Sequence, residues 1–345
     1  MSESDKIQKI SVRDVKIRAN SNFHLIGGKN ILDSEDPRFR KYRHEWVNNP
    51  GQFKVRDFPL HVDIEVTNLC NLRCPYCAAT HDGWGKNAKG KLGFEVFRKI
   101  IDEGEKNDLY SVKFSLRGEP LLHEDLPRMV EYSGSKGIID MYFNTNGVLL
   151  DEGMSRRLID AGLNRISISC DGWDKESFEG NRVGAQFEQV LSNIRGLRKL
   201  RDKLGVDYPK IRIQPVMFPE IKEHWDEYLK LWQPLADEIG YVDPREEGPG
   251  VDHRGIKGGW ACPFLWQRMI VLWDGTILPC LLHGVGDLSL MQMGNIQDTT
   301  IKEQWLSDKL SFLRNKHMSG ESHLIEACDR CSYRASEIRK SGGVI

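Results

Sequence analysis

The sequence predicts an α/β fold in which a helix-covered parallel sheet curves into an open, partial (β/α)6 barrel. From Val62 onward, short runs rich in β-branched residues alternate with amphipathic helical stretches, a pattern typical of such sheets. The pattern repeats six times, and right-handed crossovers would join the six βα units into a partial barrel. A chain of 345 residues is long enough for one large domain or two smaller ones.

The predicted strands follow from their composition. They are Val62–Thr67, Ser111–Leu116, Asp140–Asn144, Arg165–Cys170, Lys210–Val216 and Glu238–Val242. Between them, apolar residues recur at three- and four-residue spacing, as at Phe97, Ile100 and Ile101, which predicts helices.

We expect three parts. Residues 1–57 do not fit the repeat and are interpreted as an extension that covers the barrel. Within them, Asp36-Pro37 followed by spaced aromatic residues predicts one short helix with proline in its first turn. Residues 58–245 form the barrel, and a stretch rich in glycine and charge then leads into a small cysteine-rich, cluster-binding domain, 246–345.

Composition excludes several classes of protein. The 49 basic and 50 acidic side chains nearly cancel, so we expect neither a nucleic-acid groove nor a polybasic membrane anchor. No apolar run approaches the ~20 residues of a membrane span, and the polar start does not resemble a secretory signal. Eight cysteines in such a chain are typical of metal ligands in a reducing compartment, which predicts a cytoplasmic protein.

Three cysteines, Cys70, Cys74 and Cys77, stand within eight residues. Three thiolates can hold three corners of a cubane [4Fe–4S] cluster and leave the fourth iron open to a small molecule. The spacing differs from that of ferredoxins, in which four cysteines close the cluster. The alternatives are a zinc site or three buried thiols, but a structural zinc site needs four ligands and no fourth cysteine lies nearby.

These three cysteines, with Tyr76 just before the third, resemble the signature of radical S-adenosylmethionine (SAM) enzymes. The resemblance extends from about residue 60 to about residue 335 and implies the same partial barrel. It implies that the open iron chelates SAM, and that one electron then cleaves SAM to a 5′-deoxyadenosyl radical that takes a hydrogen atom from substrate. An electron-donor protein such as flavodoxin or ferredoxin is implied as a partner.

Polar motifs at the predicted strand ends extend this resemblance, because the chemistry of a parallel barrel collects there. Gly118, Glu119 and Pro120 resemble the family's Gly-Glu motif, which receives the SAM ammonium, although Gly-Glu-Pro alone is usually a turn. Asn146 follows the third strand in an Asn-Gly turn, where a structural role is equally expected.

Three further residues complete the expected SAM site. Ser169 and Arg182 resemble the serine and arginine near the SAM carboxylate, and Arg182 is alternatively a surface residue. Gln214 is a weaker candidate for ligand contact inside an apolar strand.

The tail contains a second set of cysteines, Cys262, Cys280, Cys328 and Cys331. The order resembles the SPASM/twitch extension: a cysteine, then Gly-x4-Cys on a hairpin, then Cys-x2-Cys. Four thiolates would close a second [4Fe–4S] cluster, with a zinc ion as the alternative. Only 14 residues follow the last of these cysteines and none is cysteine, so we expect no third cluster.

A closed cluster can accept an electron from a substrate radical, as oxidation of a hydroxyl-bearing carbon requires. Epimerisation needs instead a hydrogen-atom donor, commonly a thiol. The one spare cysteine, Cys170, alternates with Ser169 and Asp171 and so faces away from them, which predicts a core residue. The sequence therefore favours a dehydrogenase over an epimerase.

The expected substrate is a small molecule, a sugar or an aminocyclitol, by similarity to SPASM/twitch proteins that act on such compounds. Candidates for substrate contact are Arg117, Asp243, Arg245 and His253, each alternatively a solvated charge. Peptide (RiPP) modification stays open, although the N-terminal part is short for a leader-binding domain. A non-enzymatic metal-binding protein is the third hypothesis.

Overall fold

A computed structural model describes residues 23–28, 34–77, 88–244, 251–281 and 286–340. Within these residues one ten-stranded sheet has the order β1-β7-β6-β5-β4-β3-β2-β8-β9-β10. Strands β2 to β7 and β8 are parallel, whereas β1, β9 and β10 pair antiparallel with their neighbours. The strands are β1 (Phe23–Gly28), β2 (His61–Ile64), β3 (Ser111–Lys113), β4 (Asp140–Thr145), β5 (Arg165–Ser169), β6 (Lys210–Gln214), β7 (Glu238–Val242), β8 (Arg268–Val271), β9 (Thr276–Leu278) and β10 (Gly294–Asn295).

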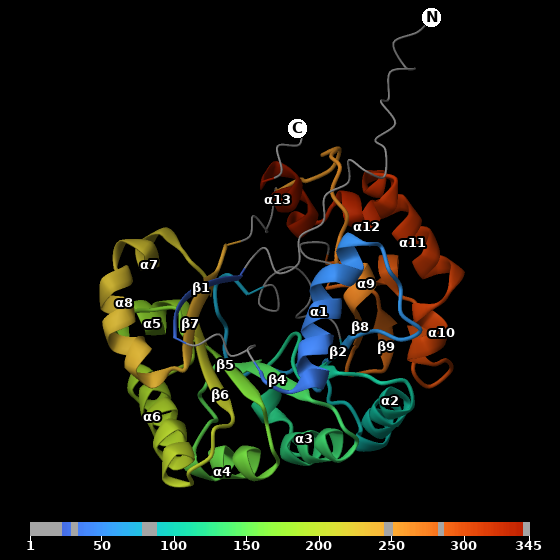
Figure 1. Ribbon diagram of the computed structural model, residues 1–345. Coiled ribbons are helices and arrows are strands. Elements are labelled where there is room, and N and C mark those ends of the chain that lie inside the picture. The colour runs from blue at the N-terminus through green and yellow to red at the C-terminus, as the bar shows by residue number, and fades with distance from the viewer. Residues whose placement is uncertain (1–22, 29–33, 78–87, 245–250, 282–285, 341–345) are drawn as a thin grey trace, which may run out of the picture.

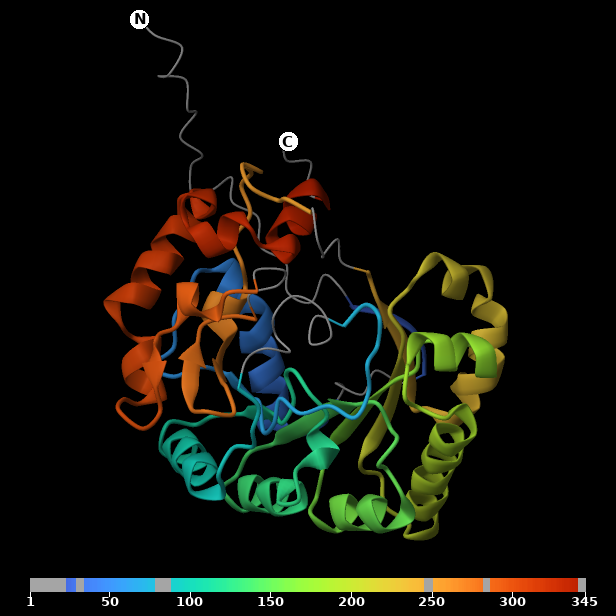
Figure 2. The same cartoon turned by 180° about the vertical axis from the view of Figure 1, so that it is seen from behind.

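The helices form an outer layer and a C-terminal group (Figures 1 and 2). The outer layer follows the convex face of the parallel strands and consists of α2 (Phe94–Lys106), α3 (Leu126–Ser135), α4 (Glu152–Asp160), α5 (Lys175–Asn181), α6 (Phe187–Lys203), α7 (Pro219–Glu223) and α8 (Trp225–Trp232). The C-terminal group comprises α9 (Phe264–Gln267), α10 (Ile301–Trp305), α11 (Asp308–Met318), α12 (Glu326–Asp329) and α13 (Ser332–Lys340). No helix in the described part of the chain is long and apolar enough to cross a membrane.

The six predicted strands all form, and the parallel α/β partial barrel is confirmed. Several strands end sooner than predicted, as at Lys113 in β3. The ladder continues to Phe114, whose N–H donates to the carbonyl of Tyr142 (2.9 Å). At Ser115 the side-chain hydroxyl instead accepts from the N–H of Asn144 (2.9 Å), so a side chain replaces the backbone partner.

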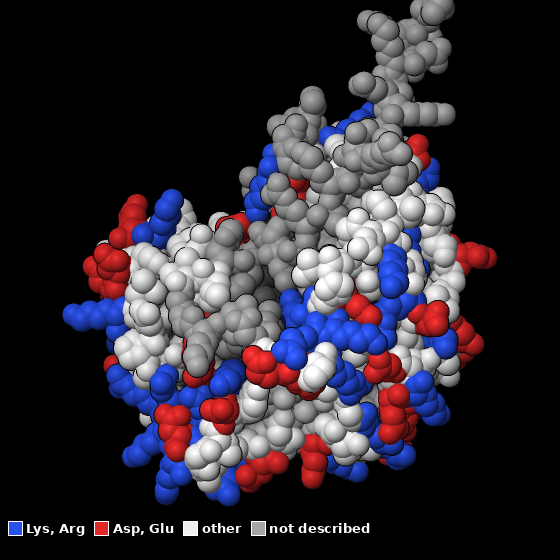
Figure 3. All heavy atoms as spheres, viewed as in Figure 1, with Lys and Arg blue, Asp and Glu red and all other residues white. Residues whose placement is uncertain are grey.

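The predicted N-terminal helix forms as α1 (Pro37–Gly51), with Asp36 as its N-cap. Its buried aromatic residues pack over the starts of β2 and β3. Tyr42 lies 5.6 Å from Tyr110, and Trp46 lies 5.8 Å from His61, measured between ring centroids. Lys and Arg side chains gather over α1 beside a hollow in the face shown in Figure 3.

The strands on either side of the six predicted ones were not predicted to join the sheet. Strand β1, Phe23–Gly28, pairs antiparallel with β7, and its Leu25 and Ile26 are exposed, so it lacks the alternating burial that marks a strand in sequence. Strand β8 lies beside β2 with Asp63 opposite Ile270, so the sheet runs through both the predicted barrel and the predicted cysteine-rich segment.

The two faces of the parallel sheet differ in polarity. In β5, Ile166 and Ile168 are fully buried under the helices, as period-two alternation predicts. Arg165, Ser167 and Ser169 point to the opposite, concave face. The concave face of β5 is therefore polar, and two of the cavities described below lie on this side of the sheet.

Candidate functional site

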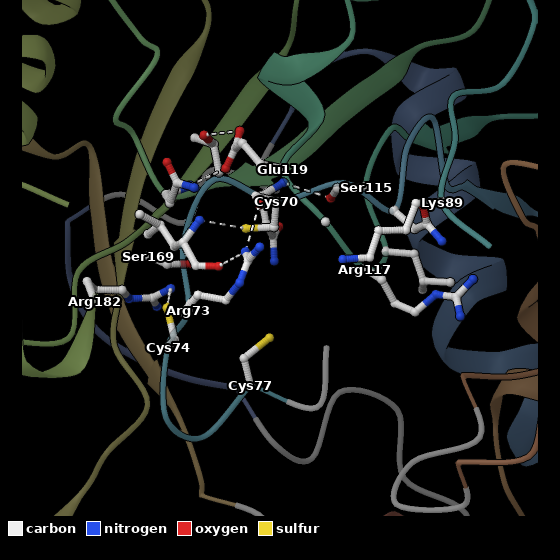
Figure 4. A pocket seen from close by; sticks show the side chains of 17 residues that line it. Cys70, Arg73, Cys74, Cys77, Lys89, Ser115, Arg117, Glu119, Ser169 and Arg182 are labelled. Atoms are coloured by element: carbon white, nitrogen blue, oxygen red, sulfur yellow. Dashed lines mark hydrogen bonds between the residues drawn. The ribbon is translucent and has the colours of Figure 1, made fainter. Parts of the chain in front are cut away.

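A cavity of 480 Å³ lies at the carboxyl ends of the parallel strands (Figure 4). This volume falls in the range of about 300–1,000 Å³ that is typical of small-molecule sites. The loops after β2, β3, β4 and β5 supply most of its wall. The described lining residues are Asn68, Cys70, Leu72, Arg73, Cys74, Cys77, Lys89, Ser115, Leu116, Arg117, Gly118, Glu119, Asn144, Thr145, Asn146, Ser169 and Arg182.

The three cysteines of the predicted cluster all line this cavity. Cys74 is buried, Cys70 is half-buried and Cys77 is exposed. The N–H of Leu72 donates to the sulfur of Cys70 (3.4 Å), as backbone amides do around anionic sulfur. Burial raises the pKa of the Cys70 and Cys74 thiols, so these residues need a metal to hold them as thiolates.

Arg182 reaches the cysteine loop from the segment after α5. Its Nη1 lies 3.9 Å from the sulfur of Cys74, and its guanidinium forms a buried ion pair with Asp171. Asp171 also accepts from the hydroxyl of Tyr76 (2.6 Å) and the N–H of Val216 (2.7 Å). Through this hydrogen bond Tyr76 links the cysteine loop to the end of β5. Tyr76 is not among the described residues that line the cavity.

The Gly-Glu motif makes the closest backbone approach in the site. Gly118 has φ +72°, and a Cβ atom there would lie 2.6 Å from the carbonyl oxygen of Leu69. The next N–H, that of Glu119, donates to the same oxygen (2.7 Å). Only glycine adopts this conformation without strain, so the residue type is required by the contact with the cysteine loop.

The buried carboxylate of Glu119 accepts three hydrogen bonds. Its carboxylate accepts from the Thr145 hydroxyl (2.7 Å), the Asn146 N–H (2.8 Å) and the Leu121 N–H (3.1 Å). Burial raises the pKa of this carboxyl group. Pro120 begins the short 3-10 turn that supplies the Leu121 donor, and it lies outside the described lining.

The other predicted SAM-site residues separate into two cavities. Asn146 and Ser169 line the cavity with the cysteines, and the Asn146 amide donates to Asn71 Oδ1 (2.9 Å). Gln214 lines a different cavity, deeper in the barrel.

Arg117 lies in the wall opposite the cysteines. Its Nε and Nη2 bond to both carboxylate oxygens of Glu65 (2.5 and 2.7 Å), and both side chains are buried. The N–H of Trp273, in the turn between β8 and β9, also points to Glu65 (3.4 Å). This ion pair therefore joins the cavity wall to the C-terminal hairpin.

The remaining substrate-contact candidates do not come together with Arg117. Asp243 forms an ion pair with Lys340 of α13 (2.8 Å). His253 is buried in the segment that leads to the C-terminal group and lies outside the described lining of the cavity. Arg245 lies outside the described residues.

The four C-terminal cysteines line one small cavity of 30 Å³. They come from distant places: Cys262 precedes α9, Cys280 follows β9, and Cys328 and Cys331 lie at α12. As the side chains are placed, no three Cys, His, Asp or Glu residues in the described part can hold a single metal ion. What supports a cluster here is the shared cavity, walled by apolar groups, rather than ligand distances.

His317 and Arg334 surround this second site, and no sequence pattern indicated them. The N–H of Cys262 donates to His317 Nδ1 (3.1 Å), so the ring proton lies on Nε2, 3.5 Å from the sulfur of Cys328. Burial lowers the pKa of His317 to about 3, which keeps the ring neutral. The N–H of Arg334 points to the sulfur of Cys331 (3.5 Å).

Sequence reasoning also missed parts of the first site. Arg73 and Lys89 line its cavity, and Asp171 anchors both Arg182 and Tyr76. Asp171 had a usable signal, since it is an acidic residue at the carboxyl end of a predicted strand. Arg73 and Lys89 had none, because exposed basic residues are common everywhere on protein surfaces.

Two curated relatives match most of this chain. A tungsten-containing aldehyde ferredoxin oxidoreductase cofactor-modifying protein of Pyrococcus furiosus is 24% identical over 315 residues, covering 79% of this chain and 86% of the relative. A probable GTP 3′,8-cyclase of Methanococcus maripaludis is 27% identical over 279 residues, covering 70% and 89%.

Two solved structures share the fold. BtrN in complex with AdoMet and 2-DOIA has a TM-score of 0.51 at 19% identity, covering 79% of this chain and 91% of that chain. Streptococcus suis SuiB bound to precursor peptide SuiA has a TM-score of 0.53 at 16% identity, covering 89% and 79%.

Family models match both parts of the molecule. The radical SAM superfamily model matches residues 64–231, and the SPASM iron–sulfur cluster-binding domain matches residues 262–332. Together they span the cysteine loop, strands β3 to β6 and all four C-terminal cysteines. The chain therefore belongs to the radical SAM superfamily and carries a SPASM-type domain, with SAM, a SAM-binding [4Fe–4S] cluster and an auxiliary cluster as its cofactors.

Proposed function

We propose that this chain is a radical SAM dehydrogenase that oxidises a hydroxyl-bearing carbon of a sugar or cyclitol. When bound, the first cluster and SAM supply the 5′-deoxyadenosyl radical that takes a hydrogen atom from that carbon. The substrate then loses the hydroxyl proton and one electron, and the carbon becomes a carbonyl. An electron-donor protein such as flavodoxin or ferredoxin would supply the first electron.

The observation that carries this proposal is the position of Cys170. It is fully buried on the helix-covered face of the sheet, and burial raises the pKa of its thiol. The hydroxyl of Tyr228 donates to its carbonyl oxygen (2.9 Å), which fixes the strand end in this orientation. Among the described residues, the cavity therefore contains no thiol other than the three cluster cysteines, and an epimerase would lack its usual hydrogen-atom donor.

The second cysteine site supports electron transfer. Its cavity of 30 Å³ is too small for a substrate, and aromatic side chains such as Trp260, Phe264 and Tyr333 wall it. Four thiolates leave no iron of a cubane cluster free. A site of this kind can take up the electron that the substrate radical loses, and it cannot bind the substrate.

The residues of the first cavity would hold SAM. Cys70, Cys74 and Cys77 are the proposed cluster ligands. Gly118 lies directly against the backbone of the cysteine loop, and its backbone carbonyl is proposed to accept from the SAM ammonium. Arg182 is proposed to bind the SAM carboxylate, because its guanidinium presents further donors beyond those that pair with Asp171.

The two structural neighbours hold different kinds of bound molecule. BtrN contains the small molecule 2-DOIA, and SuiB contains a precursor peptide, so these likenesses share the fold and leave peptide modification as an alternative. The inner cavity described next, with its small volume and its charged and polar lining, favours the small molecule.

The decisive experiment follows hydrogen and electrons together. Anaerobically reconstituted protein, incubated with SAM and candidate polyols in deuterated water, should give a carbonyl product together with 5′-deoxyadenosine. Electron paramagnetic resonance should show transient reduction of the auxiliary cluster. A product with inverted stereochemistry and solvent deuterium at the reacting carbon would establish an epimerase instead, and turnover of a peptide alone would establish a maturase.

A further inference from the structure

A second cavity, of 240 Å³, lies deeper on the concave face of the sheet. Its lining residues precede those of the SAM cavity along the same strands: Lys113 precedes Ser115 in the chain, and Arg165 precedes Ser169. Asn144 lines both cavities. A molecule held in the inner cavity therefore lies next to the proposed SAM site, where a substrate must lie to lose a hydrogen atom.

The wall of this cavity is cationic. Four basic side chains line it, namely Lys113, Arg165, Arg212 and Arg268, and the described lining includes no carboxylate. These side chains are between 9% and 16% exposed, so their charges stand in a poorly hydrated interior. Charges of one sign in such a space attract a counter-charge strongly.

Three buried carboxylates lie behind these cations. Asp140 forms a bidentate pair with Arg165 (2.8 and 2.7 Å). Asp63 is shared, at 3.1 Å from Arg268 and 3.9 Å from Lys113.

The third carboxylate, Glu238, pairs with Arg212. None of these three carboxylates belongs to the described lining, so the described wall of the cavity presents the cations. Burial and the charge of nearby Arg165 lower the pKa of Arg212, despite this pair. An anion inside the cavity would therefore face several buried guanidinium and ammonium groups.

Hydrogen-bonding groups complete the wall. The side chains of Asn144, Ser167 and Gln214 line the cavity beside the cations. Amide and hydroxyl groups both donate and accept, so they suit the hydroxyls of a polyol. The cavity therefore combines a place for one anionic group with places for neutral oxygen atoms.

We propose that the inner cavity binds an anionic group of the substrate, a phosphate or a carboxylate, and that the substrate is a phosphorylated or carboxylated sugar or cyclitol. This inference rests on the proposed function for the reaction, but the binding of the anion can be measured without it.

The test is calorimetry on the full-length, anaerobically reconstituted protein with saturating SAM, so that the first cavity is filled. The titrants are inorganic phosphate, succinate and uncharged glucose at constant ionic strength. We expect saturable binding of phosphate or succinate, and the tighter of the two identifies the class of anion. Failure of the wild-type protein to bind either anion would overturn the proposal.

Three variants locate the binding. Lys113→Gln should weaken anion binding by about tenfold or more, as expected for loss of one charged hydrogen-bond partner. Gln214→Glu, which adds a negative charge and removes no cation, should abolish it. Lys136→Gln is the matched control, because Lys136 pairs with Asp102 and Glu105 on α2, outside the lining of both cavities.

Thermal melts confirm that each variant is folded. Equal anion affinity in wild type, Lys113→Gln and Gln214→Glu would show that the cations serve only the buried carboxylates, which contradicts the proposal. Oxidation of a neutral polyol without anion binding would refute this inference alone. Anion binding without any oxidised product from anionic polyols would refute the proposed reaction alone.

Discussion

The two cysteine sites of this molecule differ in the space around the sulfur atoms. The cysteines at 70, 74 and 77 border a cavity of 480 Å³ whose wall carries arginines, amides and hydroxyls. The four C-terminal cysteines enclose 30 Å³ among aromatic and aliphatic side chains. The first site has room for a second molecule beside a cluster, and the second has room for little beyond the cluster itself.

The sites also differ in how the chain builds them. The first three cysteines lie on one loop after β2, fixed by short contacts such as that between Gly118 and Leu69. The other four are brought together from a span of 70 residues by the packing of α9, α11 and α12 against a hairpin. A local loop can yield to a ligand, whereas a site assembled from the core cannot move without disturbing that core.

The largest effect is expected on SAM cleavage, when a cysteine of the first site is removed. Cys74→Ala should lower SAM cleavage by more than about a thousandfold, because the proposed cluster loses a ligand and the reaction loses its catalyst. Formation of 5′-deoxyadenosine under dithionite is the measurement. Cys170→Ala, the buried cysteine outside both sites, is the control and should retain cleavage and iron content. Equal loss in both variants would contradict the assignment.

The second prediction concerns the coupling between SAM cleavage at the first site and product formation, which requires the second site. Cys331→Ala should leave SAM cleavage largely intact and lower product formation by at least about tenfold, since the substrate radical loses its electron acceptor. The ratio of 5′-deoxyadenosine to oxidised product reports this. A variant that keeps wild-type coupling would show that the second site is purely structural.

The third prediction concerns the close backbone contact of the open site. Gly162→Ala, at φ +79° with nothing within 4 Å of the added Cβ, should cost about 1–2 kcal/mol of unfolding free energy from the left-handed conformation alone. Gly118→Ala, at φ +72°, should cost a further 1–3 kcal/mol, approximately, from overpacking against Leu69.

Denaturant unfolding measures both costs, and SAM binding should weaken only in Gly118→Ala. If the two alanine variants lost the same stability and bound SAM equally, the contact with the cysteine loop would be unimportant.

The smallest expected effect is a shift in the reduction potential of the auxiliary cluster. His317→Phe removes the Nε2–H donor to Cys328 and should lower the reduction potential of the auxiliary cluster by on the order of 20–60 mV, the equivalent of one net hydrogen bond. A redox titration followed by electron paramagnetic resonance measures it. His323→Phe is the control, because the charged groups that act on His323 are Arg334, Lys257, Asp329 and Glu321 and include no cysteine. An unchanged potential in His317→Phe would mean that the hydrogen bond is absent from the holoprotein.

Local sequence patterns predicted the parallel part of the fold well. Strand β5 shows why: isoleucines under the helices alternate with polar residues on the concave face, and that alternation is visible in the sequence itself. The cysteine loop was equally predictable, because its three thiols are close in sequence. By contrast, the second neighbour of β2 in the sheet is β8, about 200 residues away, and no local pattern specifies such a pairing.

The deeper parts of the site escaped prediction for the same reason. Arg165, Arg212 and Arg268 come from three strands and are ordinary basic residues in the sequence, yet in the structure they face one cavity. His317 likewise has no distinguishing neighbours along its helix, and its role follows only from the approach of Cys262 and Cys328. Charge clusters of this kind are a property of strand order, which emerges only when the sheet is complete.

The pairing of β8 with β2 has a consequence for biosynthesis. Strand β2 leads directly into the cysteine loop, and during translation its outer edge stays bare until residues 268–271 leave the ribosome. One edge of β2 is thus without its native partner strand through most of the synthesis of the chain. Expression of the barrel segment without β8 would leave this edge of β2 open to pairing with other chains.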